Sequence, residues 1–187
     1  ARFGIGEKRA LFEIIRIDAE SPAGGTVPVS AAGGKVRSEN LPRFSLADVV
    51  AYVASSAPQD ATVRLLTPLK CKDKGAVSGD LSAQLFFETL ARRVRSLSYF
   101  YAPDAPLPEY NTDFSDVVME RKTLRWVTLE RKSINHPSSI NLGGFVGTFQ
   151  LKSLPPALFS LLVFGTYTHL GKNTVYGCGK YGIDRRV

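Results

Sequence analysis

Apolar residues recur along this chain with two different periods, which predict where strands and helices lie. Strict alternation over 140–152 predicts a strand with one buried face, formed by Phe145, Gly147, Phe149 and Leu151. Steps of three and four predict an amphipathic helix over 81–101. Its apolar stripe consists of Leu81, Leu85, Phe86, Leu90, Val94, Leu97 and Tyr101.

Shorter apolar runs complete the second part of the chain. We expect a strand over 62–67 that Pro68 ends, and a strand over 122–134 around Trp126. The segment 114–119 predicts a helical turn. A helix is expected over 155–167, opened by two prolines, and a last strand over 175–184.

Residues 61–184 therefore spell strand, helix, strand, strand, helix, strand. This order predicts the α+β class and a ferredoxin-like βαββαβ fold, an antiparallel sheet with two helices on one face. Before it, residues 5–18 predict one long strand and residues 21–34 a loop or hairpin. Ser45 caps a predicted helix over 46–55.

The composition bears on membrane association and on metal or cofactor binding. The longest apolar run, within 155–164, falls short of the about 20 residues that cross a bilayer, and the first residues lack the apolar core of a signal peptide. We therefore expect a cytoplasmic protein without membrane association. Cys71 and Cys178 lack the spacing of metal ligands and are expected to be reduced thiols, so neither a metal nor another cofactor is predicted.

The net charge of +7 is unevenly distributed. Residues 121–187 hold 10 basic and 2 acidic side chains, whereas residues 102–120 hold 5 acidic side chains and no Lys or Arg. Such asymmetry is typical of a protein that binds a polyanion. A basic protein without such a partner would show the same counts, so charge alone leaves both interpretations open.

The glycine- and lysine-rich segment 171–179 is the strongest candidate site. Its glycines would let the backbone approach a phosphate, and their amides would form an anion-binding nest. A Walker A loop is excluded, because five residues separate Gly165 from Gly171 and an Asn follows the Lys. A helix end followed by a bulged strand would explain the same glycines. The predicted RNA contacts are Gly171, Lys172, Asn173, Thr174, Tyr176, Gly177, Gly179 and Lys180.

A second candidate lies between Trp126 and Gly147, where Arg131, Lys132 and Ser133 follow an apolar strand. A basic strand end beside a glycine turn can hold a backbone phosphate. An ordinary hairpin with Gly-Gly in its turn would explain the same pattern. Too few positions fit the RRM signature for that module to be predicted.

The chain has two histidines, His136 and His169. His169 is the candidate general base, because it lies two residues before the glycine-rich segment and imidazole titrates near neutral pH. A surface or hydrogen-bonded imidazole is the alternative for each. Arg92, Arg93 and Arg95 either form a solvated helix face or bind a ligand.

Several of these motifs follow one another along the chain in a recognisable order. With its motifs in this order, the chain resembles the C-terminal half of the CRISPR-associated endoribonucleases that process repeat RNA, which are members of the RAMP superfamily. The matching segments are Val63 to Lys70, Arg92 to Leu97, Trp126 with Arg131 and Ser133, Gly143 to Gly147, and Gly171 to Tyr181.

The resemblance implies metal-independent cleavage in which the RNA 2′-hydroxyl attacks the adjacent phosphate, with the glycine-rich loop against the RNA. It also implies two tandem ferredoxin-like domains. Residues 1–18 would be the last glycine loop and strand of a truncated first domain, 19–60 a linker with a hairpin and a short helix, and 61–187 the RNA-binding domain. The catalytic histidine of such enzymes usually belongs to the first domain, so we expect this chain alone to bind RNA weakly and to cleave poorly or not at all.

Two other functions remain open. One is a non-catalytic RAMP subunit that holds guide RNA in an effector complex. The other is a ferredoxin-like module that binds proteins or small ligands. The expected partners are CRISPR repeat RNA and other CRISPR-associated effector subunits. The edge of the 1–18 strand also offers a pairing surface to a second copy of the chain.

Overall fold

The computed structural model describes residues 2–3, 10–11, 15–20, 26–31, 46–56, 60–102, 114–132 and 139–184. The chain divides into two compact units, residues 1–52 and residues 53–187. Among the described residues, none of the helices combines the length and the apolar character of a membrane-spanning helix. The candidate site lies in the second unit.

The first unit contains two small antiparallel pairs. Strand β1 (Arg2–Phe3) pairs with β2 (Ala10–Leu11), and β3 (Arg16–Glu20) pairs with β4 (Thr26–Ala31). The single strand predicted over 5–18 is not found in the described part of that range, because Ile15 belongs to no strand and β2 and β3 have different partners; residues 5–9 and 12–14 lie outside the described residues. The β3–β4 hairpin and helix α1 (Leu46–Ser56) agree with the hairpin and helix that the sequence predicted.

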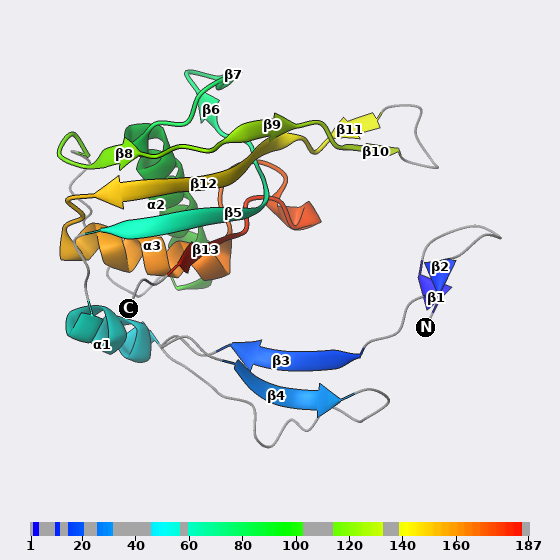
Figure 1. The fold of residues 1–187 in the computed structure, drawn as a ribbon, viewed down its shortest axis with the longest axis horizontal. Helices are drawn as coiled ribbons and strands as arrows, with labels where there is room; N and C mark the ends of the chain where they lie inside the picture. The colour runs from blue at the N-terminus through cyan, green and yellow to red at the C-terminus, as the bar shows by residue number, and fades with distance from the viewer. Residues whose placement is uncertain are drawn as a thin grey trace. The chain divides into compact units, whose positions relative to one another are not determined.

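The second unit is built on one antiparallel sheet. Its strands follow the order β13 (Tyr181–Asp184), β5 (Ala61–Leu69), β12 (Gly144–Lys152) and β8 (Val118–Glu120), and β9 (Arg125–Val127) pairs with the other half of β12. Helices α2 (Ala83–Tyr101) and α3 (Pro156–Thr168) lie behind one face of the sheet in Figure 1. The predicted ferredoxin-like fold is confirmed.

Three short elements extend from the ends of the strands. β6 (Lys72–Asp73) and β7 (Ala76–Val77) form a hairpin after β5, and β10 (Glu130–Lys132) and β11 (Ser139–Asn141) form another before β12. A 3-10 turn, η2 (Thr174–Tyr176), lies in the connection from α3 to β13. The β10–β11 hairpin and this connection supply the candidate site.

An aromatic cluster fills the core between the sheet and the helices. Phe86 of α2 is fully buried, and its ring makes edge contacts with Phe87, Phe149 and Tyr181 at centroid distances of 5.5, 5.3 and 5.5 Å. The Tyr181 hydroxyl donates a hydrogen bond of 2.6 Å to the Leu162 carbonyl of α3. The cluster thereby joins a helix to both a central and an edge strand.

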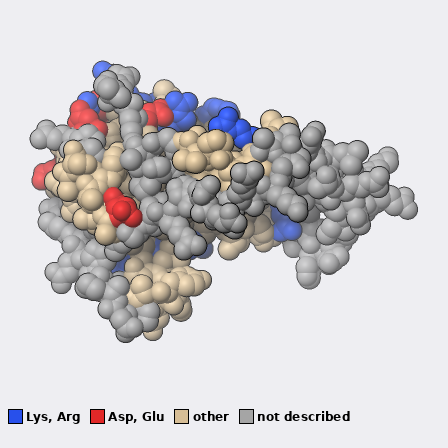
Figure 2. All heavy atoms as spheres, turned by 90° about the horizontal axis from the view of Figure 1, so that it is seen from below, with Lys and Arg blue, Asp and Glu red and all other residues tan. Residues whose placement is uncertain are grey.

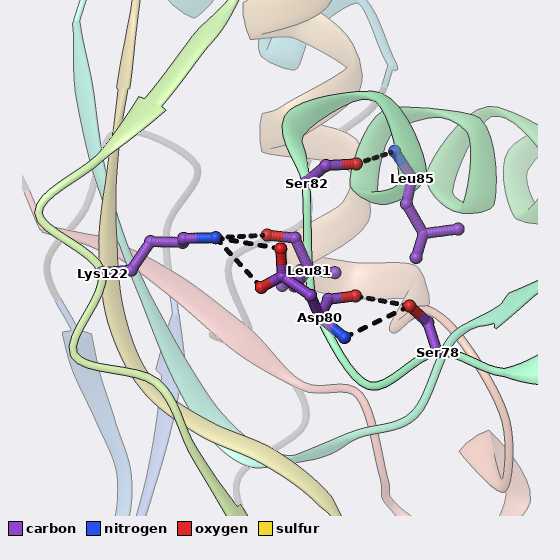
Figure 3. Close-up of polar contacts among 6 residues, drawn as sticks. All are labelled: Ser78, Asp80, Leu81, Ser82, Leu85 and Lys122. Carbon is purple, nitrogen blue, oxygen red and sulfur yellow. Dashed lines mark hydrogen bonds and ion pairs between the residues drawn. The ribbon is translucent and has the colours of Figure 1, made fainter.

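The start of α2 is fixed by its cap and by an ion pair, as Figure 3 shows. The Ser82 hydroxyl accepts a hydrogen bond of 3.1 Å from the Leu85 amide, which satisfies one of the free amides of the first turn. The Lys122 ammonium lies 3.0 Å from the Asp80 carboxylate and donates to the Leu81 carbonyl at 3.3 Å. These contacts join the segment between β8 and β9 to the beginning of α2.

Two strand predictions on the site side need correction. β5 does not end at Pro68 but continues to Leu69. The register between β5 and β12 shifts between Leu65 and Leu69, so the missing amide of Pro68 interrupts no regular hydrogen-bond ladder there. The last strand begins at Tyr181 rather than at residue 175, since residues 174–176 form the 3-10 turn.

Other boundaries also differ from the prediction. The strand expected over 122–134 is two strands, β9 and β10, with residues 128–129 between them, and residues 133–134 lie outside the described residues. The turn expected over 114–119 covers 114–117 and gives way to β8. In α2 the side chain of Tyr101 is 82% exposed, whereas Phe87, which lay outside the predicted stripe, is buried.

Candidate nucleic-acid interface

The segment 171–180 is fastened along the end of β5. The Lys172 amide donates to the Lys70 carbonyl at 2.8 Å, and the Gly179 amide donates to the Pro68 carbonyl at 3.0 Å. The Thr67 hydroxyl donates to the Gly177 carbonyl at 2.8 Å and accepts from the Lys180 amide at 2.8 Å. The glycine-rich loop is therefore held in place by hydrogen bonds to the end of β5, a central strand of the sheet.

Two glycines of this loop are required by their surroundings. Gly171 has a φ of +82°, and a Cβ there would lie 2.5 Å from the Lys70 carbonyl oxygen. Gly179 has a φ of +76°, and a Cβ there would lie 1.8 Å from the Leu170 carbonyl oxygen. Both positions combine a left-handed backbone with close backbone contact, which glycine alone accommodates.

Many of the loop amides donate to carbonyls of the loop itself or of β5. The Gly177 amide donates to the Thr174 carbonyl, the Tyr176 and Cys178 amides donate to the Asn173 carbonyl, and the Gly179 amide is taken by Pro68. These amides are therefore not available to a phosphate. The contribution of the loop to binding a ligand lies mainly in its side chains, of which Lys172 is exposed and Tyr176 is 43% exposed.

The structure brings the two candidate segments together. The Arg131 guanidinium of β10 lies 5.0 Å from the centroid of the Tyr176 ring in the glycine-rich loop. Such a cation–π pair holds the guanidinium beside the aromatic ring. The Lys132 side chain, Ser133 and His136 lie outside the described residues.

The base of the β10–β11 hairpin is tied to the same loop. The Asn173 side-chain amide donates to the Asn141 carbonyl at 3.1 Å, and the Cys178 thiol donates to the Leu142 carbonyl at 3.7 Å. Asn173, predicted as an RNA contact, thus uses one of its donors within the protein. Thr174 lies in the 3-10 turn and is half-buried.

His169 ends α3 with a φ of +54°, and its Nδ1 lies 3.3 Å from the Cys178 carbonyl oxygen. A carbonyl oxygen only accepts, so Nδ1 carries the proton in this hydrogen bond and Nε2 is the nitrogen with a free lone pair. The half-buried ring therefore helps to hold the loop and keeps one basic nitrogen.

The basic side chains near the glycine-rich loop form fewer ion pairs than Lys152, which lies at the end of β12 away from the loop. Lys152, at that end, lies 2.6 Å from the Asp60 carboxylate and 3.9 Å from that of Glu120. Arg131, Lys172 and Lys180 form no ion pair with any other described residue. Uncompensated charge of this kind attracts a polyanion. On the face seen in Figure 2, most Lys and Arg atoms gather at the upper centre and most Asp and Glu atoms lie toward the left.

Among the other candidates from the sequence, Arg93 has a structural role. Arg93 donates from Nε to the Thr168 carbonyl at 3.2 Å, which ties α2 to the end of α3, while Arg92 and Arg95 are exposed. Both cysteines are free and buried. Burial raises the pKa of the Cys71 thiol to about 11 and also raises the pKa of Cys178. No cluster of metal-ligating side chains occurs in the described part of the chain.

Sequence reasoning missed three residues that organise the site: Thr67, Lys70 and Asn141. Lys70 is 9% exposed, and its ammonium donates to the Asn141 carbonyl at 2.8 Å and to the Asn141 side-chain oxygen at 3.1 Å. A lysine placed directly after a buried strand was a signal in the sequence. Its partner was not foreseeable, because it lies 71 positions later in the chain.

The family comparison covers this whole arrangement. The family model of the CRISPR-associated endoribonuclease Cas6 matches residues 63–181, more than half of the chain. The chain belongs to the Cas6 family. The match begins in β5 and ends in β13, so it includes the glycine-rich loop, both helices and the β10–β11 hairpin of this Cas6-family chain. The resemblance to repeat-RNA-processing endoribonucleases is confirmed.

Solved structures agree with the fold of this Cas6-family chain. A partial Cas6-RT-Cas1–Cas2 complex matches with a TM-score of 0.55 and 17% identity over 86% of this chain and 29% of that chain. A Thermus thermophilus Cas6 matches with a TM-score of 0.51 and 18% identity over 87% of this chain and 60% of that chain. The product complex of the same Cas6 matches with a TM-score of 0.50 and 18% identity over 76% of this chain and 56% of that chain.

The Cas6-family chain thus spans little more than half the length of the Thermus Cas6 chains. No curated protein matches it. At these identities the structural matches support the fold, and the chemistry rests on the residues described above.

Proposed function

We propose that this Cas6-family chain binds CRISPR repeat RNA for processing, through a loop–hairpin surface formed by Arg131, Lys172, Tyr176 and Lys180. The observation that carries the proposal is the Arg131–Tyr176 contact, which places a cation and an aromatic ring from two separate segments side by side. Family membership supports RNA as the ligand.

The chemistry of these side chains suits a single RNA strand. Lysine and arginine attract the phosphates, and bound phosphates release their counterions. An exposed tyrosine provides a face on which a base stacks, and the guanidinium plane of Arg131 provides another. Backbone attraction and base stacking therefore come from adjacent residues, while the buried anchors of the loop keep them in place.

Removing one phosphate contact should weaken RNA binding and its dependence on salt together. For Lys172→Ala we expect the slope of log K against log salt to fall by about 0.7, the value for one contact with a single strand. Fluorescence anisotropy with labelled repeat RNA at several salt concentrations measures both quantities. Lys152→Ala removes the same charge at the other end of β12, beside Asp60, and should leave the slope unchanged.

Two outcomes would count against this surface. Equal slopes for the unmodified chain and Lys172→Ala would show that Lys172 meets no phosphate. A flat salt response of the unmodified chain would exclude RNA as the ligand and favour a module that binds proteins or small molecules.

We propose His169 as the candidate proton-transferring group. The 2′-hydroxyl would give its proton to Nε2 and form a bond to phosphorus, while the bond from phosphorus to the 5′-oxygen breaks and that oxygen takes a proton from water. The imidazolium then returns its proton to the solvent. His169→Gln removes the basic nitrogen but keeps an N–H donor for the Cys178 carbonyl, so it should slow the weak cleavage expected of this chain in EDTA by about 10²-fold or more with little change in RNA affinity. Unchanged cleavage, or an unmodified chain that cleaves nothing, would assign proton transfer to a group elsewhere.

The proposal also covers the protein partners and the cellular compartment of this chain. One matched structure is a partial Cas6-RT-Cas1–Cas2 complex, and association with other CRISPR proteins is therefore a reasonable extension to this chain. We place its work in the cytoplasm, a reducing compartment in which the free thiols of Cys71 and Cys178 would persist.

A further inference from the structure

Lys70 is the one charged residue among the buried polar side chains that the structure describes. It follows β5 directly, and its ammonium lies against neutral groups: the two oxygens of Asn141 and, 6.0 Å away, the centroid of the Trp126 ring. No described carboxylate lies within ion-pair distance of it.

Burying a cation among neutral oxygens costs free energy, which the hydrogen bonds of the ammonium must offset. Two of the three N–H donors of Lys70 end on Asn141. Hydrogen bonds from a charged donor are stronger than neutral ones, and these two orient both oxygens of a single residue.

Asn141 in turn connects the hairpin with the glycine-rich loop. Its carbonyl oxygen also accepts from Asn173 of the loop, and its side-chain oxygen also accepts from the Gly143 amide at 2.8 Å. The backbone of Lys70 reaches the same loop, since its carbonyl accepts from the Lys172 amide. Lys70 therefore contacts the hairpin through its side chain and the loop through its backbone.

We infer that Lys70 is a positioning residue, which sets the distance between the β10–β11 hairpin and the glycine-rich loop so that Arg131 and Tyr176 meet the same RNA strand. The inference rests on the proposed RNA binding. Because Lys70 is only 9% exposed and two of its donors are occupied, it acts through Asn141 and not by direct contact with a phosphate.

Lys70→Met isolates this role. Methionine keeps an unbranched apolar stem in the buried site, and each oxygen of Asn141 retains its second donor, so the fold should survive. RNA affinity should fall about tenfold, the loss expected for hydrogen bonds to a charged group, while the salt slope stays at the value of the unmodified chain. Lys152→Met, with the same loss of charge, should change neither.

A double-mutant cycle tests whether Lys70 acts through Asn141. Asn173→Ala removes the other tie on the Asn141 carbonyl, so Lys70→Met and Asn173→Ala should be non-additive. Lys70→Met combined with Lys180→Ala should be closer to additive in its effect on affinity. Additivity in the first pair would overturn the inference, and so would a lower salt slope in Lys70→Met, which would mean direct phosphate contact.

Hydrogen exchange tests the same inference without RNA. In Lys70→Met the amides of residues 139–143 and 171–179 should exchange faster, whereas those of β12 beyond residue 147 should stay protected. Unchanged exchange in both segments would overturn the positioning role whether or not RNA binds. Faster exchange in a chain that binds no RNA would instead refute the proposed function and leave the structural link intact.

Discussion

Replacing Gly179 with alanine is expected to destabilise the second unit by about 3 kcal/mol and to abolish most RNA binding. A left-handed backbone costs a residue with a Cβ about 1–2 kcal/mol. The remainder arises because the new Cβ would lie 1.8 Å from the Leu170 carbonyl oxygen, which is backbone and cannot rotate away. The loop must shift and would lose its hydrogen bond to Pro68.

Gly177→Ala is the matched control. Gly177 has a similar φ of +80°, yet a Cβ there would meet nothing within 4 Å. Its substitution should therefore cost only the conformational term, about 1 kcal/mol, with little loss of RNA affinity. Urea unfolding and RNA anisotropy of both variants measure the difference. Equal destabilisation by the two substitutions would contradict the close approach of Gly179 to Leu170.

Phe86→Ala is expected to lower the free energy of unfolding by about 4 kcal/mol, because it leaves a cavity at the centre of the core. The lost ring contacts Phe87, Phe149 and Tyr181, so the substitution weakens α2, the central strand β12 and the edge strand β13 at once. Aromatic pairs add about 0.5–1.5 kcal/mol each to the burial term. This loss equals much of the stability of an ordinary domain.

Phe100 provides a comparison on the same helix. Its ring is 73% exposed, and its recorded ring contact is with neighbouring Tyr99. Phe100→Ala should therefore change the free energy of unfolding by less than about 0.5 kcal/mol. Urea titration monitored by circular dichroism gives both values. A loss below about 1 kcal/mol for Phe86→Ala would mean that the aromatic cluster does not hold the sheet to α2.

Elements whose burial follows a simple period were predictable from the sequence. In β12, Phe149 and Leu151 face the helices, and Phe149 pairs with Val63 of β5, as strict alternation requires. The predicted stripe of α2 failed at two positions: Phe87, outside the stripe, is buried, and Tyr101, at its end, is exposed. Local periodicity reports one buried face and cannot report where that face ends.

The site was less predictable because its contacts are non-local. Val175 and Tyr176 have strand-forming side chains, but the anchoring of residues 177–180 to Thr67 and Pro68 keeps this part of the chain out of the sheet. The glycines did indicate a special backbone. They could not indicate that Lys70 and Asn141, which no motif connects, would hold the loop and hairpin together.

The placement of β13 has a consequence for the order of assembly during synthesis. β13 pairs with β5, and the bonds from Thr67 to the loop join positions 110 and 113 residues apart. Contacts between such distant positions form late, since a long segment must first be closed. A nascent chain that has not yet extruded β13 will therefore hold most of its core without an ordered glycine-rich loop. We expect the ability to engage RNA to be acquired only after β13 has paired with β5.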